Sequence, residues 1–271
     1  MPELPEVETT RRGIEPHVSG QRIQKIIVRE RRLRWPVEQG LEQRVRGQTI
    51  ENVSRRGKYL LLHTQAGSLI IHLGMSGSLR ILPCATPPLK HDHLDIVLSN
   101  QQCVRLRDPR RFGCVFWTTT EPLQHSLLKD LGPEPLSDAF DSDYLYRLSR
   151  KRKIAIKQFI MNSHIVVGVG NIYANEALFM AGIRPGLAAG RISRPRYLRL
   201  VSAIKTVLTD AIQQGGTTLR DFTASDGNPG YFQQQLNVYG RSGELCRQCN
   251  NPIKSLQQGQ RATFYCPQCQ K

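Results

Sequence analysis

The chain has 271 residues, which is more than one average domain and favours two modest domains or one domain with an appended module. Its 38 Lys and Arg residues outnumber 22 Asp and Glu residues, and the formal net charge of +16 indicates a polyanionic partner. The positive charge could instead serve only solubility, or it could attract anionic lipid. No apolar run approaches the roughly 20 residues that span a bilayer. We therefore expect no membrane partner.

The N-terminus reads MPELPEVE, with acids where a leader would carry Lys or Arg, and no apolar segment follows, so we expect a cytoplasmic protein. Residues 3–14 predict a short helix, because acids occupy the first turn. Runs rich in strand-forming residues follow at residues 23–28, 58–63, 68–73, 94–99 and 103–107. Short turns separate these runs, a pattern typical of an antiparallel β-sandwich or open barrel.

The second half of the chain carries apolar residues at helical spacing. Residues 131–141 contain three acids and two prolines without periodicity, and we interpret them as an interdomain linker. Helices are predicted at residues 142–162, 172–182 and 194–214. The sequence thus predicts an N-terminal domain at 1–130, the linker at 131–141, a helical domain at 142–235 and a terminal module at 236–271.

Four of the seven cysteines crowd into the terminal module. Cys246, Cys249, Cys266 and Cys269 form two C-x2-C pairs separated by sixteen residues, which is the spacing of a zinc site with four cysteine ligands. Redox activity or an iron–sulfur cluster would be alternatives, but no βαβ pattern surrounds the pairs. Four thiolates leave no open coordination position, so one structural zinc ion is expected. We expect no chemistry from Cys84, Cys103 and Cys114.

Cations and glycines mark a second candidate site in the helical half. Gly168 and Gly170 precede a helix that opens near Asn171, and free backbone N–H groups at such a turn suit a phosphate. The cations Arg150, Lys151, Arg152, Lys153 and Lys157 precede this turn. A grip on a nucleic-acid backbone is one interpretation and a solvated face is the other.

Turns in the β half carry large side chains where small polar residues are usual. Met75 lies in GMSGS, and Arg110 and Phe112 lie in DPRRFG. Apolar wedges and Arg can fill the hole left by an extruded base, although such residues also pack on their own sheet. His91 and His93 share one strand face at i, i+2, which suits a metal ligand pair or, by preference, a surface or phosphate contact.

Pro2 becomes the chain terminus if Met1 is removed. An α-amino group with a pKa of about 8 is roughly a tenth neutral at pH 7, which permits attack on the anomeric carbon of a sugar. The resulting iminium serves as an electron sink for β-elimination. At the other end of the chain, the turn GQR puts Arg261 at the tip or shoulder of the cysteine hairpin, where it is either a positioned cation or one more solvated Arg.

The ordered motifs together resemble the bacterial formamidopyrimidine-DNA glycosylase family nearly end to end. These motifs are MPELPEVETTRRGIEP, RRGKYL, HLGMSGSLR, KHDH, DPRRFG, LGPEPL, VVGVGNIYANEAL, QGGTTLRDF, VYGR and the four-cysteine hairpin. The resemblance implies an α+β protein: an N-terminal antiparallel β-sandwich with an N-terminal helix, a helix-two-turn-helix domain and a C-terminal zinc β-hairpin.

The resemblance also implies roles for individual residues. Pro2 would be the Schiff-base nucleophile, Glu3 its acid–base partner, Lys58 a proton donor in β-elimination and Arg261 the donor in δ-elimination. Glu6 would support the terminal amine, and residues 217–231 would form a lid over the damaged base. The void-filling residues would be Met75, Arg110 and Phe112, and the phosphate contacts would be His91, Arg152, Lys157 and Asn171.

The implied substrate is double-stranded DNA that contains oxidised purines, namely 8-oxoguanine or formamidopyrimidines, or abasic sites. Leu4 points to this purine branch, because the sister enzymes for oxidised pyrimidines usually carry Gly there. A catalytically silent lesion-binding protein is the alternative, and intact Pro2, Glu3 and Lys58 speak against it. We expect a monomer.

Overall fold

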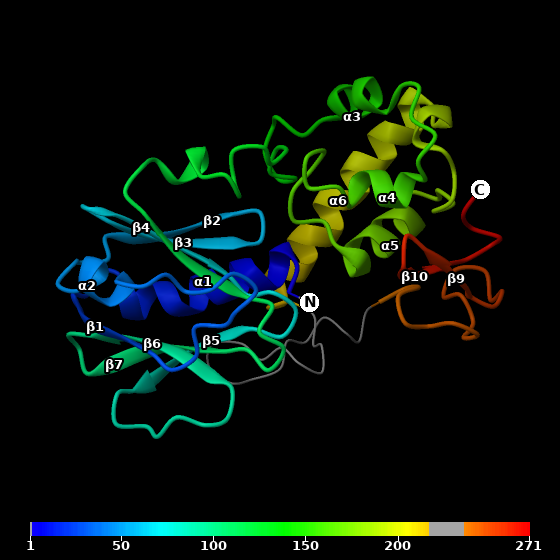
Figure 1. Cartoon of the computed structure of the whole chain (residues 1–271). Coiled ribbons are helices and arrows are strands. Elements are labelled where there is room, and N and C mark those ends of the chain that lie inside the picture. The colour runs from blue at the N-terminus through cyan, green and yellow to red at the C-terminus, as the bar shows by residue number, and fades with distance from the viewer. Residues whose placement is uncertain (1, 217–235) are drawn as a thin grey trace. The chain divides into compact units, whose positions relative to one another are not determined.

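A computed structural model describes residues 2–216 and 236–271, which form two compact units (Figure 1). The first unit contains residues 2–129 and 214–216, and the second contains residues 130–213 and 236–271. The predicted lid at residues 217–231 lies outside the described residues.

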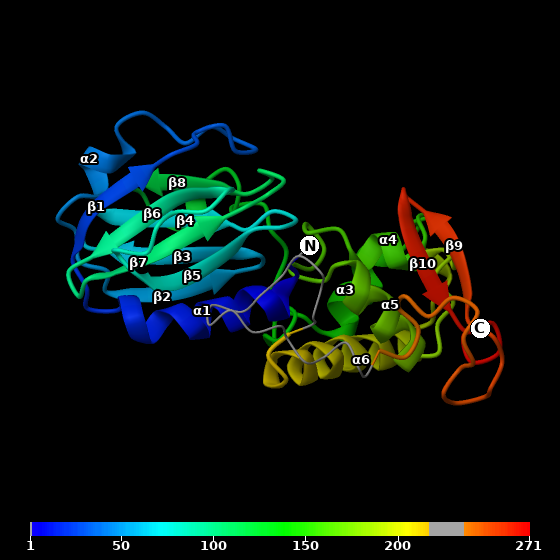
Figure 2. The same ribbon diagram turned by 90° about the horizontal axis from the view of Figure 1, so that it is seen from below.

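Two four-stranded antiparallel sheets form the first unit, which confirms the predicted N-terminal sandwich (Figure 2). One sheet has the order β1-β6-β7-β5 and the other has the order β2-β3-β4-β8. Their strands are β1 (Ile23–Val28), β2 (Asn52–Arg56), β3 (Tyr59–Thr64), β4 (Gly67–His72), β5 (Ser78–Pro83), β6 (Asp92–Leu98), β7 (Gln102–Arg107) and β8 (Cys114–Thr118). The short helices α2 (Leu41–Val45) and η1 (Pro122–Gln124) complete the unit.

The core of this unit lies between the sheets because alternate side chains of each strand point to the same face. Leu60 and Leu62 on β3 and Val104 and Leu106 on β7 are all buried in one apolar cluster. β2, β5 and β8 were not predicted. In β2, only Val53 is buried, so the strand depends on its pairing with β3 and carries little periodic signal of its own.

Helix α1 (Leu4–Val18) contacts β2 and β5, which are the edge strands of the two sheets on the same side of the sandwich. A helix in this place covers edges that would otherwise be exposed. The helix is longer than predicted because Val18 extends its buried stripe beyond Ile14. Its packing fixes the N-terminal residues at one end of the sandwich.

The second unit is helical, as predicted, and ends in a β-hairpin. Its helices are α3 (Ser142–Ser149), α4 (Ile156–Ile160), α5 (Asn171–Met180), η2 (Ala189–Arg191) and α6 (Arg194–Gln213). The single helix predicted at 142–162 is wrong, because the chain breaks between α3 and α4, with Lys151 at φ +62°. The cations at residues 151–153 are exposed and supply no buried face to continue a helix.

Strands β9 (Lys254–Gln258) and β10 (Arg261–Tyr265) form the terminal hairpin. Gly259 and Gln260 have φ values of +55° and +58°, which are the positive values that a two-residue type I′ hairpin turn requires. β10 contacts α5 within the same unit. No helix in the described part of the chain combines the length and the apolar character that a membrane span requires.

Candidate functional site

The first group of candidate residues lies at the start of α1. Pro2 is buried, and the Glu3 side chain beside it is only 2% exposed. The Glu3 N–H donates a 2.8 Å hydrogen bond to Glu6 Oε2, and Glu6 is itself fully buried. Two carboxylates therefore lie within one helical turn of Pro2, where a helix N-terminus favours negative charge.

Gly216, three residues after the end of α6, lies close to Glu6. The backbone there has φ +82°, and a Cβ atom would lie 3.3 Å from Cγ and Oε1 of Glu6. A side chain at this position would therefore press on the carboxylate that holds Glu3. The close approach explains why a glycine occupies position 216.

Lys58 lies in the turn between β2 and β3, directly after Gly57 at φ +58°. It is half-buried and lies near His72, which is at the end of the neighbouring strand β4. Burial, followed by the positive charges of Lys58 and Arg34, lowers the pKa of His72 to about 4. The imidazole is therefore neutral at pH 7, and its Nδ1 accepts a 3.0 Å hydrogen bond from Gly74 N–H.

The structure brings Met75, Arg110 and Phe112 together, although they come from two separate turns. A Cβ atom on Gly74 would lie 2.3 Å from the backbone carbon of Phe112, so the two turns touch backbone to backbone. The guanidinium carbon of Arg110 lies 4.9 Å from the centre of the Phe112 ring. Phe112 is 41% exposed, which leaves it available to a partner.

The predicted strand position of His91 is wrong, because β6 begins at Asp92, although the His91 and His93 rings still lie close together with their centroids 6.3 Å apart. His91 lies in a turn before β6 with φ +76°, a left-handed conformation that takes it out of the strand alternation. His93 is buried within β6, and its Nε2 lies 2.8 Å from the carbonyl oxygen of Asp108. Among the described residues, the group suited to a metal ion comprises the four terminal cysteines, not these histidines.

In the second unit, Lys157 and Asn171 converge on strand β10. Lys157 is 1% exposed, and its Nζ donates to the Ala262 carbonyl oxygen at 2.9 Å and to Thr263 Oγ1 at 2.7 Å. Asn171 Nδ2 donates to the same Ala262 oxygen at 3.1 Å. Because Arg261 precedes Ala262, these polar groups gather at the start of β10.

Arg261 and Arg152 are both exposed cations on fixed backbone. Arg261 is the first residue of β10, next to the hairpin turn, where it pairs with Gln258. The Arg152 N–H donates to the Ser149 carbonyl at 3.0 Å, and its own carbonyl accepts from Gly190 at 3.0 Å. Each side chain can therefore reach outward from a backbone that is held by hydrogen bonds.

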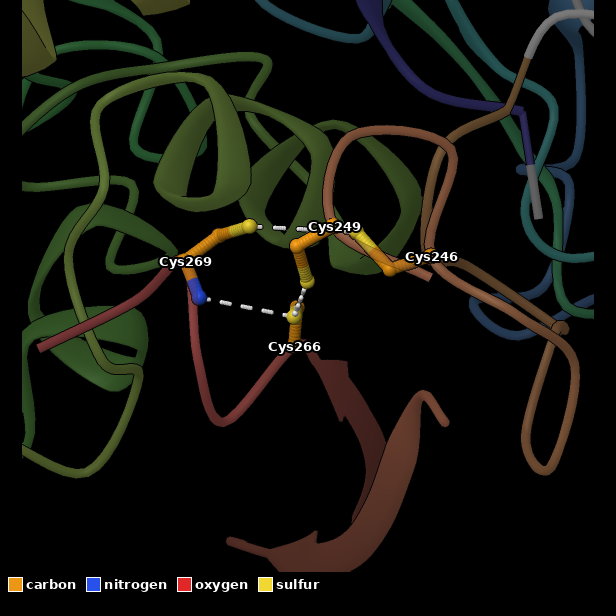
Figure 3. Close-up of side chains that lie close together, drawn as sticks. All are labelled: Cys246, Cys249, Cys266 and Cys269. Atoms are coloured by element: carbon orange, nitrogen blue, oxygen red, sulfur yellow. Dashed lines mark hydrogen bonds between the residues drawn. The ribbon is translucent and has the colours of Figure 1, made fainter. Parts of the chain in front are cut away.

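The four terminal cysteines converge on one point (Figure 3). Their sulfur atoms all lie within 4.8 Å of one another, with Cys246–Cys269 at 3.8 Å and Cys249–Cys266 at 3.4 Å. A tetrahedral zinc ion with Zn–S bonds of about 2.3 Å holds its sulfurs about 3.8 Å apart. The distances are too long for disulfides, whose sulfurs lie about 2.05 Å apart, and they fit four ligands of one metal ion.

The surroundings of these sulfurs also suit a cation. The Asn251 side chain donates to Cys249 Sγ at 3.5 Å, and this bond, together with the Asn251 backbone and the neighbouring sulfurs, lowers the pKa of the Cys249 thiol to about 6. Burial, followed by the neighbouring sulfurs, raises the pKa of Cys266 and Cys269. A divalent ion among them would offset this cost by stabilising all four thiolates.

Two side chains of α5 that the sequence analysis did not single out hold the terminal module, which includes the hairpin, on the second unit. Glu176 accepts from the backbone N–H groups of Asn237, Val238 and Tyr239 at 2.8 to 2.9 Å. Asn175 Oδ1 accepts from Phe264 N–H at 2.8 Å. Both residues lie in the motif NIYANEAL on α5. A polar side chain within this otherwise apolar helix was the sequence signal that could have revealed them.

Comparison with known proteins accounts for nearly the whole chain. The formamidopyrimidine-DNA glycosylase N-terminal domain matches residues 1–115, and the formamidopyrimidine-DNA glycosylase H2TH domain matches residues 131–223. A zinc finger found in FPG and IleRS matches residues 243–271. With the sulfur geometry, this last match identifies the terminal site as a structural zinc site.

Full-length relatives and solved structures agree with these matches. Formamidopyrimidine-DNA glycosylases of Thioalkalivibrio sulfidiphilus and Stutzerimonas stutzeri are 60% and 59% identical over 271 residues, with 100% of each chain covered. The MutM (Fpg) structure from Thermus thermophilus has a TM-score of 0.89 at 37% identity and covers 99% of this chain and 98% of its own.

Several similar solved structures are complexes of Lactococcus lactis Fpg with DNA, among them the following two. An Fpg point mutant in complex with Fapy-dG-containing DNA has a TM-score of 0.93 at 35% identity, with 100% of both chains covered. The complex of Fpg with DNA containing an abasic site has a TM-score of 0.92 at 35% identity, with 99% of both chains covered. The sandwich, the helical unit and the zinc hairpin agree with this full-length identity. The chain belongs to the formamidopyrimidine-DNA glycosylase family.

Proposed function

We propose that this protein is a bifunctional DNA glycosylase and abasic-site lyase of base excision repair. It excises oxidised purines, 8-oxoguanine and formamidopyrimidines, from duplex DNA through a Schiff base at Pro2, and then cleaves the strand by β- and δ-elimination. The observation that carries the proposal is the buried N-terminal group, in which Pro2 lies beside Glu3 and the Glu6 carboxylate fixes the Glu3 backbone at 2.8 Å.

The chemistry begins once Met1 is removed and Pro2 is a secondary amine. Its nitrogen forms a bond to C1′ of the damaged nucleotide while the glycosidic bond breaks, and the base leaves with the bonding electrons and a proton. Opening of the sugar ring gives an iminium ion, with Glu3 as the acid–base partner. The iminium cannot be neutralised by loss of an N–H proton, so it acidifies C2′ and promotes loss of the 3′-phosphate.

Lys58 serves as a proton donor in β-elimination, and Arg261 serves in δ-elimination, which releases the 5′-phosphate. Lys58 is supported in this role by its half-buried turn beside a neutral His72. Arg261 is supported by its exposed position beside the turn of a hairpin whose second strand leads directly to Cys266 of the zinc site. Zinc supplies no catalysis, because four thiolates fill its tetrahedral coordination.

The proposed partner is double-stranded DNA with oxidised purines or abasic sites. Fapy-dG DNA and abasic-site DNA are the partners in the Lactococcus lactis complexes, and the net charge of +16 favours a polyanion. Met75, Arg110 and Phe112 fill the space left by the extruded nucleotide. The phosphate backbone is contacted by His91, Arg152, Lys157 and Asn171. Lys157 is buried, and it also holds β10 through its hydrogen bond to the Ala262 carbonyl oxygen.

Borohydride trapping tests the nucleophile directly. Mature protein is incubated with a duplex that contains 8-oxoguanine, the imine is reduced, and the cross-linked residue is located by mass spectrometry. We expect one DNA adduct at the nitrogen of Pro2. The form that retains Met1 should give no adduct, because its Pro2 nitrogen is an amide.

Two variants separate this proposal from its alternatives. Pro2→Gly keeps a primary amine and should retain part of the trapping yield, whereas a full yield from the Met1-retaining form would overturn the assignment. A lesion-binding protein without catalysis would bind the duplex but neither release the base nor form an adduct. A duplex with an oxidised pyrimidine completes the test, because faster release of that base would contradict the proposed preference for purines.

A further inference from the structure

A buried carboxylate lies between the two turns that carry Met75, Arg110 and Phe112. Asp108 is 0% exposed. Its Oδ1 accepts a 2.6 Å hydrogen bond from the Ser76 hydroxyl, and its Oδ2 accepts a 2.7 Å hydrogen bond from Gly113 N–H. A buried charge persists only when such donors compensate for the lost water, so both turns contribute to keeping this carboxylate in place.

Ser76 carries the connection from one turn to the other. It follows Met75 directly, and its oxygen accepts a 3.1 Å hydrogen bond from Arg110 N–H while its hydroxyl hydrogen is donated to Asp108. A hydroxyl offers one donor and two acceptor positions, so both bonds form together. The residue after Met75 is thereby bonded to the backbone of Arg110.

The Asp108 backbone fixes the rest of the second turn. Its carbonyl oxygen accepts from Arg111 N–H at 3.1 Å and lies 2.8 Å from His93 Nε2, and its N–H donates to the His91 carbonyl at 3.0 Å. Arg111 has φ +57°, so the chain reverses sharply between Arg110 and Phe112. Asp108 thus holds the turn through both its backbone and its side chain.

We propose that Ser76 and Asp108 are positioning residues that join the two turns, so that Met75, Arg110 and Phe112 enter the damaged duplex as one preassembled group. This inference rests on the void-filling role proposed above. Extrusion of a base costs stacking and pairing energy, and side chains that are already arranged lose less conformational freedom when they replace it. The link should therefore matter for removing a paired base and not for the later elimination chemistry.

Ser76→Ala tests the link, with Ser68→Ala as the matched control. Ser68 is also a buried serine of the first unit, and its hydroxyl lies 3.0 Å from His63 Nδ1, away from the two turns. Single-turnover rates are measured for excision of 8-oxoguanine opposite cytosine and for cleavage of the same duplex with a preformed abasic site. The abasic duplex has no base to extrude.

We expect Ser76→Ala to slow excision about tenfold, because it removes both hydrogen bonds of the Ser76 hydroxyl. Cleavage of the abasic duplex should stay within about twofold of the wild-type rate, since it involves no base extrusion. Ser68→Ala should leave both rates unchanged. In a Phe112→Ala background, Ser76→Ala should cost less than in the wild type, because both changes affect the same group.

The outcomes are distinguishable. Equal losses on both substrates, or full additivity with Phe112→Ala, would overturn the positioning role. If Phe112→Ala slows excision selectively while Ser76→Ala behaves like Ser68→Ala, the positioning inference alone is wrong. If Phe112→Ala itself has no selective effect, the void-filling role fails and this inference fails with it. Asp108→Asn, which keeps the size and one acceptor, provides a second variant and should show the same selectivity.

Discussion

His72 shows how one residue couples the site to pH. Its pKa is lowered to about 4 by burial and by the positive charges of Lys58 and Arg34. Protonation would remove the Nδ1 acceptor that Gly74 N–H uses and would place a new charge near Lys58. Since the ordinary pKa of His is about 6.5, the unfolded chain takes up this proton more readily than the folded protein does.

Because the pKa of His72 is lower in the folded protein, the folded state keeps its full stability above about pH 6.5. The free energy of unfolding then decreases as the pH falls toward 4. We expect His72 to contribute a loss of about 3 kcal/mol in the free energy of unfolding between pH 7 and pH 4. His72→Asn, which cannot titrate in this range, should remove that part of the pH dependence.

Urea unfolding followed by tryptophan fluorescence measures this effect in the first unit alone, because Trp35 and Trp117 are the two tryptophans of the chain and both lie in that unit. Other groups titrate in both proteins, so the comparison is between the two pH profiles. Parallel profiles for the wild type and His72→Asn would contradict the assignment of the effect to His72.

At the scale of elements, the zinc hairpin illustrates local dependence on a metal. Its strands bury few apolar side chains, and β9 is exposed along nearly its whole length. The apolar cluster around it consists largely of the cysteines themselves, together with Phe179, Val238 and Ile253. So small a core gives little stability without the metal.

We therefore expect Cys249→Ser to abolish stoichiometric zinc and most DNA cleavage while the first unit stays folded. Structural zinc sites of this size bind with roughly 10 to 16 kcal/mol, enough to decide whether the hairpin folds. Metal analysis, the tryptophan unfolding curve and lesion cleavage are measured on the same preparation. Arg261→Ala is the matched variant, and it should lose much of the cleavage and keep the zinc.

Bound iron in place of zinc, or full cleavage after metal loss, would overturn this account. Loss of the tryptophan unfolding transition in Cys249→Ser would show that the metal supports more than the terminal hairpin.

The elements also show what a sequence can reveal. β1 and the cysteine spacing are local patterns, and both were predicted within their residues. The strand β2 depends on its pairing with β3, so the periodicity of the sequence did not reveal it. The break between α3 and α4 coincides with the exposed cations at 151–153, which interrupt the apolar spacing only briefly. The candidate catalytic residues came from a family resemblance, and their roles stay predictions. Ser76 and Asp108 gave no signal, because their connection exists only where two turns meet.

At the scale of the whole molecule, ion pairs within the protein can neutralise only part of its positive charge. The 22 acids can neutralise at most 22 of the 38 cations, and several acids pair with more than one Arg. Glu8, for example, contacts Arg11, Arg12 and Arg55. The surplus that results is available for DNA phosphates, and each phosphate contact releases counterions.

Salt dependence of binding tests this electrostatic grip. If about six phosphates are contacted, the logarithm of the DNA affinity should fall with the logarithm of salt concentration at a slope of about −5. Arg152→Gln should reduce the magnitude of that slope by about 1 and weaken damaged and undamaged duplexes alike, because phosphates carry little information about the lesion. Arg44→Gln removes the same charge from a side chain paired with Glu38 at 2.9 Å and should leave the slope unchanged. A slope near zero would eliminate the phosphate contacts, whereas loss of affinity for one lesion only would assign Arg152 to the damaged base instead of the backbone.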